Sequence, residues 1–198
     1  MKRKPSAILF DMDGVLVDSL DSWWFSLNSA LRAFNHKAIT RNEFIEKYWG
    51  HDLYDNLDRM GLDHRIGTFC NNVYGEHLDA IKIYPDTRDT LEKFKEYKKG
   101  VITNTPKDCT CRILKKFDIE QFFDSVTTSD EVPKAKPYPD IVLKACNVLD
   151  VKPEDVVLIG DTDSDVKAGR AAGCTVVGIN INADYTIKRL SETTKLII

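Results

Sequence analysis

Residues 7–14 read AILFDMDG, an apolar run of four residues followed directly by two aspartates and a glycine. The run has no polar alternation, which is typical of a strand buried on both faces of a parallel sheet. In open α/β sheets, ligands bind outside the carboxyl ends of the strands, and Asp11 and Asp13 follow such an end. The stretch therefore predicts a parallel sheet with a polar site at the end of its first strand.

Further apolar runs of the same kind alternate with helical patterns along the chain. The predicted strands are 7–10, 100–103, 125–128, 156–159 and 175–179, and the predicted helices are 87–97, 107–117, 139–149 and 164–172. Alternation of strand and helix is the pattern of a doubly wound α/β fold. We therefore predict an α/β, Rossmann-like core with a parallel sheet, and residues 195–198 as a candidate further edge strand.

The segment 19–84 interrupts this alternation. Its apolar residues recur at helical spacing, as at Trp24, Leu27 and Leu31, and it is too long for a connecting loop. Pro85 marks the return to the core, because proline disfavours a helix at the residue before it. The expected domains are an α/β catalytic core over 1–18 and 85–198 and an inserted helical cap over 19–84.

Within the cap, residues 48–52 read YWGHD and break a helical run with a glycine. We interpret this segment as a cap loop that faces the polar edge of the sheet. In the alternative interpretation, Trp49 packs inside the cap and Gly50 ends a helix. Arg59 and Arg65 are candidates for contact with an anionic substrate, although charges on a cap surface are more often solvated.

Composition excludes several classes of protein. The chain has 198 residues, 42% of them hydrophobic and 30% charged, so it can bury an ordinary globular core. Its net charge of -3 argues against nucleic-acid binding through phosphate contacts. Apolar runs are too short to cross a bilayer, and the five cysteines show no disulfide spacing. We expect a cytoplasmic monomer or homodimer with reduced thiols and neither nucleic-acid nor membrane partners.

Polar residues also follow the other predicted strands: Thr103 and Asn104, then Lys136, then Asp161 and Asp165. Carboxylates that converge on one crevice repel one another and raise their own pKa values unless a cation neutralises them. Hard oxygen ligands select a hard cation such as Mg²⁺. A lysine and a hydroxyl at the same place supply charge and hydrogen bonds for phosphate oxygens. The constellation thus suits a phosphoryl group and Mg²⁺.

These motifs resemble those of the haloacid dehalogenase superfamily, on its phosphatase side. The matching segments are DMDGVLVDS at 11–19, TN at 103–104, KPYPD at 136–140 and GDTDSD at 160–165. The helical insertion stands where that family places its type 1 cap. One departure is Ala135, where many phosphoglycolate phosphatase relatives have glycine, and it concerns the shape of the loop before Lys136.

The resemblance implies a role for each of these residues. Asp11 is expected to be the nucleophile that forms an aspartyl phosphate, and Asp13 the acid that protonates the leaving oxygen and then activates water. The implied Mg²⁺ ligands are the Asp11 carboxylate, the Asp13 backbone carbonyl and Asp161, with Asp165 direct or through water. The implied phosphate-binding groups are Thr103, the backbone N–H of Asn104 and Lys136, which offsets charge between nucleophile and phosphate.

Asp13 separates the branches of the superfamily. Its dehalogenases lack an acid two residues after the nucleophile, and its transport ATPases carry threonine there, so Asp13 favours phosphate ester hydrolysis. The resemblance thus implies a Mg²⁺-dependent phosphatase of a small phosphorylated metabolite. The first candidate substrate is 2-phosphoglycolate, because the pattern looks most similar to phosphoglycolate phosphatases; pyrophosphate, sugar phosphates and nucleoside monophosphates stay open.

Three alternatives carry different expectations. A phosphomutase resembling β-phosphoglucomutase usually has a histidine shortly after the first motif, where this chain reads LDSW at 20–23. A receiver-like signalling module also phosphorylates an aspartate on a doubly wound sheet, but it lacks both the second acid and a large cap. A catalytically idle interaction protein would have little reason to keep every motif position.

Overall fold

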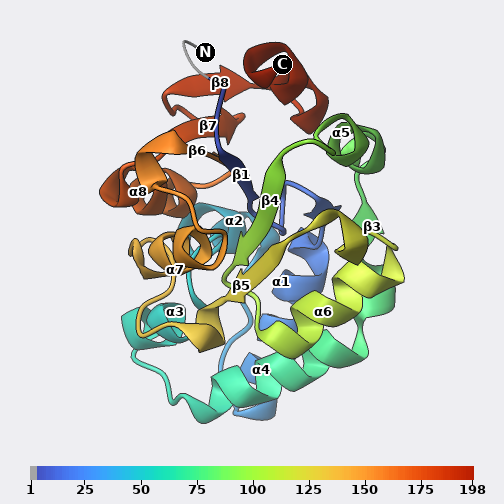
Figure 1. Cartoon of the computed structure of the whole chain (residues 1–198). Coiled ribbons are helices and arrows are strands. Elements are labelled where there is room, and N and C mark those ends of the chain that lie inside the picture. The colour runs from blue at the N-terminus through green and yellow to red at the C-terminus, as the bar shows by residue number, and fades with distance from the viewer. Residues whose placement is uncertain (1–3) are drawn as a thin grey trace.

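The main sheet of the computed structural model has six strands, all parallel, in the order β5-β4-β1-β6-β7-β8 (Figure 1). The structure describes residues 4–198, and residues 1–3 of the predicted core lie outside the described residues. The strands are β1 Ala7–Phe10, β4 Lys98–Thr103, β5 Ser125–Thr128, β6 Val156–Gly160, β7 Thr175–Ile179 and β8 Tyr185–Ile187. The predicted α/β, doubly wound fold is confirmed.

The first strand, β1, lies in the middle of the sheet and is fully buried. Ile8 and Phe10 pack into the cluster on one face, whereas Ala7 and Leu9 pack into the cluster on the other. Covering both faces explains why the strand lacks polar alternation. In the pairing register, Phe10 lies opposite Val101 of β4 and Ile159 of β6, so the carboxyl ends of these three strands lie within two residues of one another.

Helices cover both faces of the sheet. They are α5 Thr87–Lys93, α6 Lys107–Lys116, α7 Asp140–Val148, α8 Asp163–Ala172 and the short α9 Thr194–Ile197. Leu91 of α5 and Ile113 of α6 belong to the core cluster on one face, and Ile141 of α7 and Val166 of α8 to the cluster on the other. Short 3₁₀ turns occur at Leu78–Ala80, Glu120–Phe122, Ser129–Glu131, Pro153–Asp155 and Leu190–Thr193.

Two predicted elements differ from the structure. Residues 195–198 were expected as an edge strand, but 194–197 form α9, and Ile197 is buried in the core cluster that also holds Leu91. The added edge strand is instead β8. The helix predicted over 87–97 ends at Lys93, and the chain then turns so that the buried Lys99 ammonium donates to the carbonyls of Phe94 and Tyr97.

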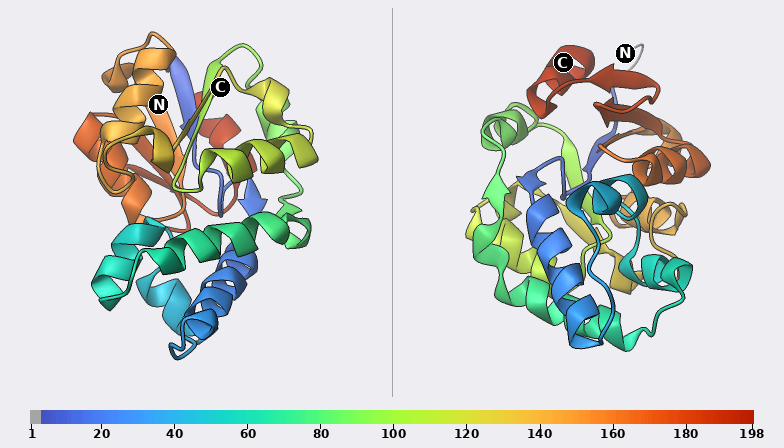
Figure 2. Two further views of the ribbon diagram at one scale, coloured as in Figure 1. Left: turned by 90° about the horizontal axis from the view of Figure 1, so that it is seen from below. Right: turned by 180° about the vertical axis from the view of Figure 1, so that it is seen from behind.

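The segment between β1 and α5 forms four helices: α1 Leu20–Ala33, α2 Arg41–Lys47, α3 Leu53–Met60 and α4 Arg65–Glu76. Leu27, Phe44, Leu57 and Ile66 form the centre of its own hydrophobic cluster. Figure 2 shows α1 and α4 side by side, below the sheet in its left view. The two connections to the core pair as a small antiparallel sheet of β2 Val17–Asp18 and β3 Lys82–Ile83.

None of the helices in residues 4–198 is both long and apolar enough to cross a membrane.

Candidate active site

Asp11 stands directly after β1, and its side chain is almost fully buried. Its backbone N–H continues the sheet by donating to the carbonyl of Ile159, at 2.9 Å. One carboxylate oxygen, Oδ1, accepts from the backbone N–H of Met12 at 2.7 Å and lies 2.8 Å from Nζ of Lys136. Burial, followed by the nearby charge of Asp165, raises the pKa of Asp11 well above its usual range. The sheet thus holds a buried carboxylate directly against a buried ammonium.

Lys136 bridges two aspartates, although its side chain is only 2% exposed. Its Nζ lies 2.8 Å from Oδ1 of Asp11 and 2.8 Å from Oδ1 of Asp165. Burial alone would lower the pKa of Lys136, but the two carboxylates reverse this and raise it. Asn104 fixes the lysine's backbone: its Nδ2 donates to the Lys136 carbonyl at 2.9 Å, and its Oδ1 accepts from the Lys136 N–H at 3.0 Å. Lys136 is therefore a fixed positive charge at the site.

Asp161 and Asp165 come from the turn between β6 and the beginning of α8. Oδ2 of Asp165 accepts from the N–H of Thr162 at 3.1 Å and from its hydroxyl at 2.6 Å, which closes a capping box at the start of the helix. Asp161 lies against Gly14, which has a φ of +83°, and a Cβ on Gly14 would lie 2.0 Å from Oδ2 of Asp161. Gly14 is therefore needed for the loop after β1 to meet the loop after β6.

Three carboxylates form a cluster that fits a hard cation. One oxygen each from Asp11, Asp161 and Asp165 lies within 4.8 Å of the others. Oδ1 of Asp161 is buried and has no hydrogen-bond partner among residues 4–198. Burial, followed by the charge of Asp165, raises the pKa of Asp161 to about 7. Such an oxygen-only set with an unpartnered atom matches the ligands that Mg²⁺ prefers.

The carboxylate of Asp13 is surrounded by hydroxyl groups. Its Oδ2 accepts from Thr105 at 2.7 Å and from Thr103 at 3.1 Å. Its Oδ1 accepts from the hydroxyl of Ser19 and, at 3.4 Å, from that of Tyr74. The hydroxyl of Thr103, predicted to bind phosphate, thus points at Asp13 in this structure, and its phosphate-binding role stays a prediction.

Thr105, Ser19 and Tyr74 were not predicted as site residues. Thr105 and Ser19 stand inside or beside the motifs, so a search for hydroxyl groups near them would have found both. Tyr74 comes from α4, 61 residues after Asp13. It is fully buried and stacks on Trp23 with ring centroids 3.8 Å apart. Its part in the site depends on how α1 and α4 pack, which no local pattern indicates.

The segment 48–52 faces the polar edge of the sheet, as predicted. The indole N–H of Trp49 donates to Oδ2 of Asp161 at 3.4 Å, and Nδ1 of His51 lies 3.4 Å from the hydroxyl of Ser164. The alternative interpretation holds in part, because Trp49 also packs edge-on against Phe44, with centroids 6.1 Å apart. Trp49 therefore belongs both to the hydrophobic cluster of helices α1 to α4 and to the site.

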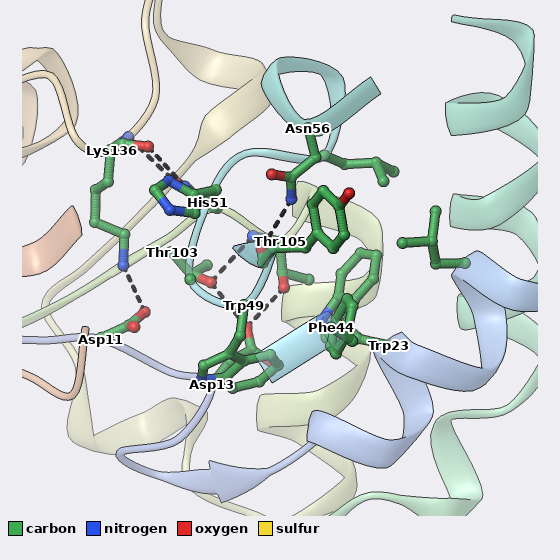
Figure 3. Close-up of a pocket in the computed structure, with 15 residues that line it drawn as sticks. Asp11, Asp13, Trp23, Phe44, Trp49, His51, Asn56, Thr103, Thr105 and Lys136 are labelled. Carbon is green, nitrogen blue, oxygen red and sulfur yellow. Dashed lines mark hydrogen bonds and ion pairs between the residues drawn. The ribbon is translucent and has the colours of Figure 1, made fainter. Parts of the chain in front are cut away.

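A cavity lies between segment 48–52 and the sheet (Figure 3). Its lining on the sheet side consists of predicted site residues and Thr105: Asp11, Asp13, Thr103, Asn104, Thr105 and Lys136. Figure 3 shows the Lys136 ammonium directed at Asp11, with Trp49 and His51 across from them. The structure thus brings the predicted nucleophile, acid and phosphate-binding residues together, while Asp161 and Asp165 complete the carboxylate cluster beside Asp11.

Known proteins share both the sequence and the fold. Residues 8–179 match the family of haloacid dehalogenase-like hydrolases. The chain is 32% identical to a phosphoglycolate phosphatase of Haemophilus influenzae, with 94% of this chain and 91% of that protein covered. It is 27% identical to the pyrophosphatase PpaX of Bacillus mycoides, with 96% and 95% covered. A solved structure described as a predicted phosphoglycolate phosphatase of Haemophilus somnus covers 100% of both chains at 25% identity, with a TM-score of 0.84.

The family match spans most of the chain and includes every segment that contributes to the cavity's sheet side. The chain therefore belongs to the haloacid dehalogenase-like hydrolase family and is a member of its phosphatase type.

Proposed function

We propose that this protein is a Mg²⁺-dependent phosphatase that hydrolyses a small phosphorylated metabolite through an aspartyl phosphate on Asp11. The observation that carries the proposal is the 2.8 Å contact between Lys136 Nζ and Asp11 Oδ1 in a cavity that Asp13 also lines. A buried, fixed cation beside a carboxylate lets that anion approach an anionic phosphoryl group. The family match and the phosphatases among its relatives support the same reaction.

The reaction then takes two steps. A carboxylate oxygen of Asp11 forms a bond to phosphorus while the bond from phosphorus to the substrate oxygen breaks, and Asp13 gives that oxygen a proton. Water next attacks the aspartyl phosphate and loses a proton to Asp13, which releases inorganic phosphate and restores Asp11. The four hydroxyl groups around Asp13 hold its carboxylate in one orientation between the two steps.

Mg²⁺ would supply positive charge that keeps Asp11 ionised and offsets the charge of the phosphoryl group. The groups proposed to hold it are the carboxylates of Asp11 and Asp161 and the backbone carbonyl of Asp13. Both oxygens of Asp165 already bond to Lys136 or Thr162, so contact through water suits Asp165 better than direct coordination.

The relatives suggest which substrates to test first. 2-Phosphoglycolate is the first candidate by similarity to phosphoglycolate phosphatases, and pyrophosphate follows from the PpaX relative. Sugar phosphates and nucleoside monophosphates complete the panel. The five cysteines are free thiols, which supports the further proposal of a cytoplasmic enzyme.

The test is release of inorganic phosphate from this panel, with Mg²⁺ and with EDTA, by wild type and by Asp11→Asn. We expect Mg²⁺-dependent release that the substitution reduces to below a tenth. Metal-independent release, or an Asp11→Asn variant that keeps more than a tenth of the activity, would contradict the mechanism. Isomerisation of a sugar phosphate that needs a bisphosphate and releases no net phosphate would favour the phosphomutase, and a long-lived phosphoaspartate without turnover would favour a receiver-like module.

A further inference from the structure

The cap side of the cavity is built from large apolar side chains. They are Trp23, Leu27, Phe44, Tyr48, Trp49 and Leu53. Figure 3 shows three of these rings, Trp23, Phe44 and Trp49, gathered across the cavity from Asp11 and Lys136. When a phosphoryl group lies against Asp11, the rest of the substrate must extend toward this apolar wall, because the sheet side is occupied by the phosphate-binding groups.

Two polar side chains of the wall, Asn56 and His51, have partners within the protein. Asn56 donates from Nδ2 to the carbonyl of Tyr48 at 2.8 Å and accepts at Oδ1 from Arg59 at 3.3 Å. His51 pairs with Ser164, and burial, together with the positive charge of Arg59, lowers the pKa of His51, so its ring is neutral near pH 7. The wall therefore offers mainly apolar carbon, with a neutral imidazole, the Tyr48 hydroxyl and the Trp23 indole N–H as further polar groups.

Cap arginines do not contribute to this wall. Among residues 4–198, the lining contains one cation, Lys136, and it is paired with Asp11 and Asp165. Arg59 is exposed, contacts Asn56 from outside the lining and lies 6.0 Å from the centre of the Tyr48 ring. Arg65 is exposed and bonded to Asp63 at 2.7 Å. A second anionic group on the substrate would thus be buried against apolar carbon without a countercharge, which is strongly unfavourable.

We infer that the physiological substrate is a phosphate monoester of an uncharged, apolar or aromatic alcohol. This inference rests on the proposed phosphatase function and narrows its substrate class. Each methylene buried against the wall improves binding by roughly fourfold, and aromatic rings such as Trp23 and Phe44 favour a flat ring as partner. The lack of a free cation in the wall among residues 4–198 argues against 2-phosphoglycolate and pyrophosphate as the physiological substrate, because each carries a second anionic group.

The test compares matched substrates that differ in one charge. Isobutyl phosphate has nearly the shape of 2-phosphoglycolate without its carboxylate, and benzyl phosphate pairs with 4-carboxybenzyl phosphate. For the Mg²⁺-loaded full chain we expect kcat/KM to be at least tenfold higher for the uncharged member of each pair. A ratio below tenfold in both pairs, or a reversed ratio, overturns the inference while leaving the phosphatase intact. Phosphate release from none of the four, nor from the wider panel, overturns the proposed function and this inference with it.

Two variants test the wall itself. Leu53→Lys introduces a cation into the lining, so it should shift the preference at least tenfold toward the carboxylate-bearing member of each pair. Arg59→Met removes a cap cation that contacts Asn56 from outside the lining, and it should leave both ratios unchanged. If Arg59→Met instead lowers kcat/KM selectively for the charged substrates, Arg59 reaches the substrate and the inference is wrong.

Discussion

The hydroxyl of Thr105 donates a hydrogen bond of 2.7 Å to Oδ2 of Asp13. We expect Thr105→Val to lower kcat by roughly 10- to 100-fold with little change in KM, because a hydrogen bond to a charged group contributes about 1.5–3 kcal/mol. The reason is that Asp13 must point at the leaving oxygen, and Thr105 is a positioning residue for it. Steady-state kinetics with the best substrate of the panel measures both parameters.

Thr105→Ser is the matched control, since it keeps the hydroxyl and removes only a methyl group. It should retain most of the wild-type kcat. A Val variant that keeps the wild-type kcat while the Ser variant loses activity would mean that packing of the methyl group, and not the hydrogen bond to Asp13, is what the site needs.

Lys136 makes a second testable contribution, this time to stability. Lys136→Met leaves the buried carboxylates of Asp11 and Asp165 facing each other without their shared cation. Breaking a buried ion pair in this way costs about 3–5 kcal/mol. We expect that loss in the free energy of unfolding, measured by urea denaturation in EDTA. Adding Asp165→Asn to Lys136→Met removes one of the two opposed negative charges. The double variant should therefore recover part of the lost free energy of unfolding. A loss below roughly 1 kcal/mol would show that the three charges are not coupled in this way.

The sequence was informative about this site because of how a parallel sheet is built. β1, β4 and β6 are adjacent and their carboxyl ends lie within two residues of one another, so residues at those ends meet whatever the details of packing. Strands such as β1 are buried on both faces, which makes their apolar runs easy to recognise. Asp11, Thr103 and Asp161 were therefore predictable from order along the chain alone.

Contacts made by the cap were less predictable. The Tyr74 hydroxyl reaches Asp13 only because α4 packs on α1 and brings the ring against Trp23. Helical periodicity indicates a buried face of a helix, but not which buried residue turns a polar atom toward the end of the sheet. The tail 195–198 ends in two β-branched residues, a local pattern that favours a strand, and the burial of Ile197 against the core in a helical turn is a tertiary effect.

Stability of the metal-free protein should depend on pH. Burial, followed by the charge of Asp165, raises the pKa of Asp161 to about 7 from its ordinary value of 3.8. Between these values the folded chain binds more protons than the unfolded chain, so stability falls as pH rises through this window. Across the two pH units from 5 to 7 this one group would remove about 2–3 kcal/mol of stability. We therefore expect the Tm in EDTA to be lower at pH 7.5 than at pH 5 by several degrees, since about 1 kcal/mol shifts the Tm of a domain of this size by roughly 2–4 °C.

The control for this pH dependence is Asp161→Asn, which cannot ionise. Its Tm should change less between the two pH values than that of wild type, and Mg²⁺ at pH 7.5 should raise the Tm of wild type more than that of the variant. Identical pH profiles for the two proteins would remove Asp161 as the group responsible.

Gly50 is the point at which the cap loop meets the core. It has a φ of +76°, and a Cβ added there would lie 2.4 Å from Cγ2 of Thr162. Gly50→Ala therefore has to push the loop away from the start of α8 and separate Trp49 from Asp161.

Gly61 supplies a matched control, because it also has a positive φ, +68°, but a Cβ there meets nothing within 4 Å. Both variants carry the left-handed backbone strain of about 1–2 kcal/mol, and only Gly50→Ala adds the clash. We expect kcat/KM to fall at least tenfold in Gly50→Ala and to stay within about twofold of wild type in Gly61→Ala. Equal activities would mean that the loop need not seat against Thr162 for turnover.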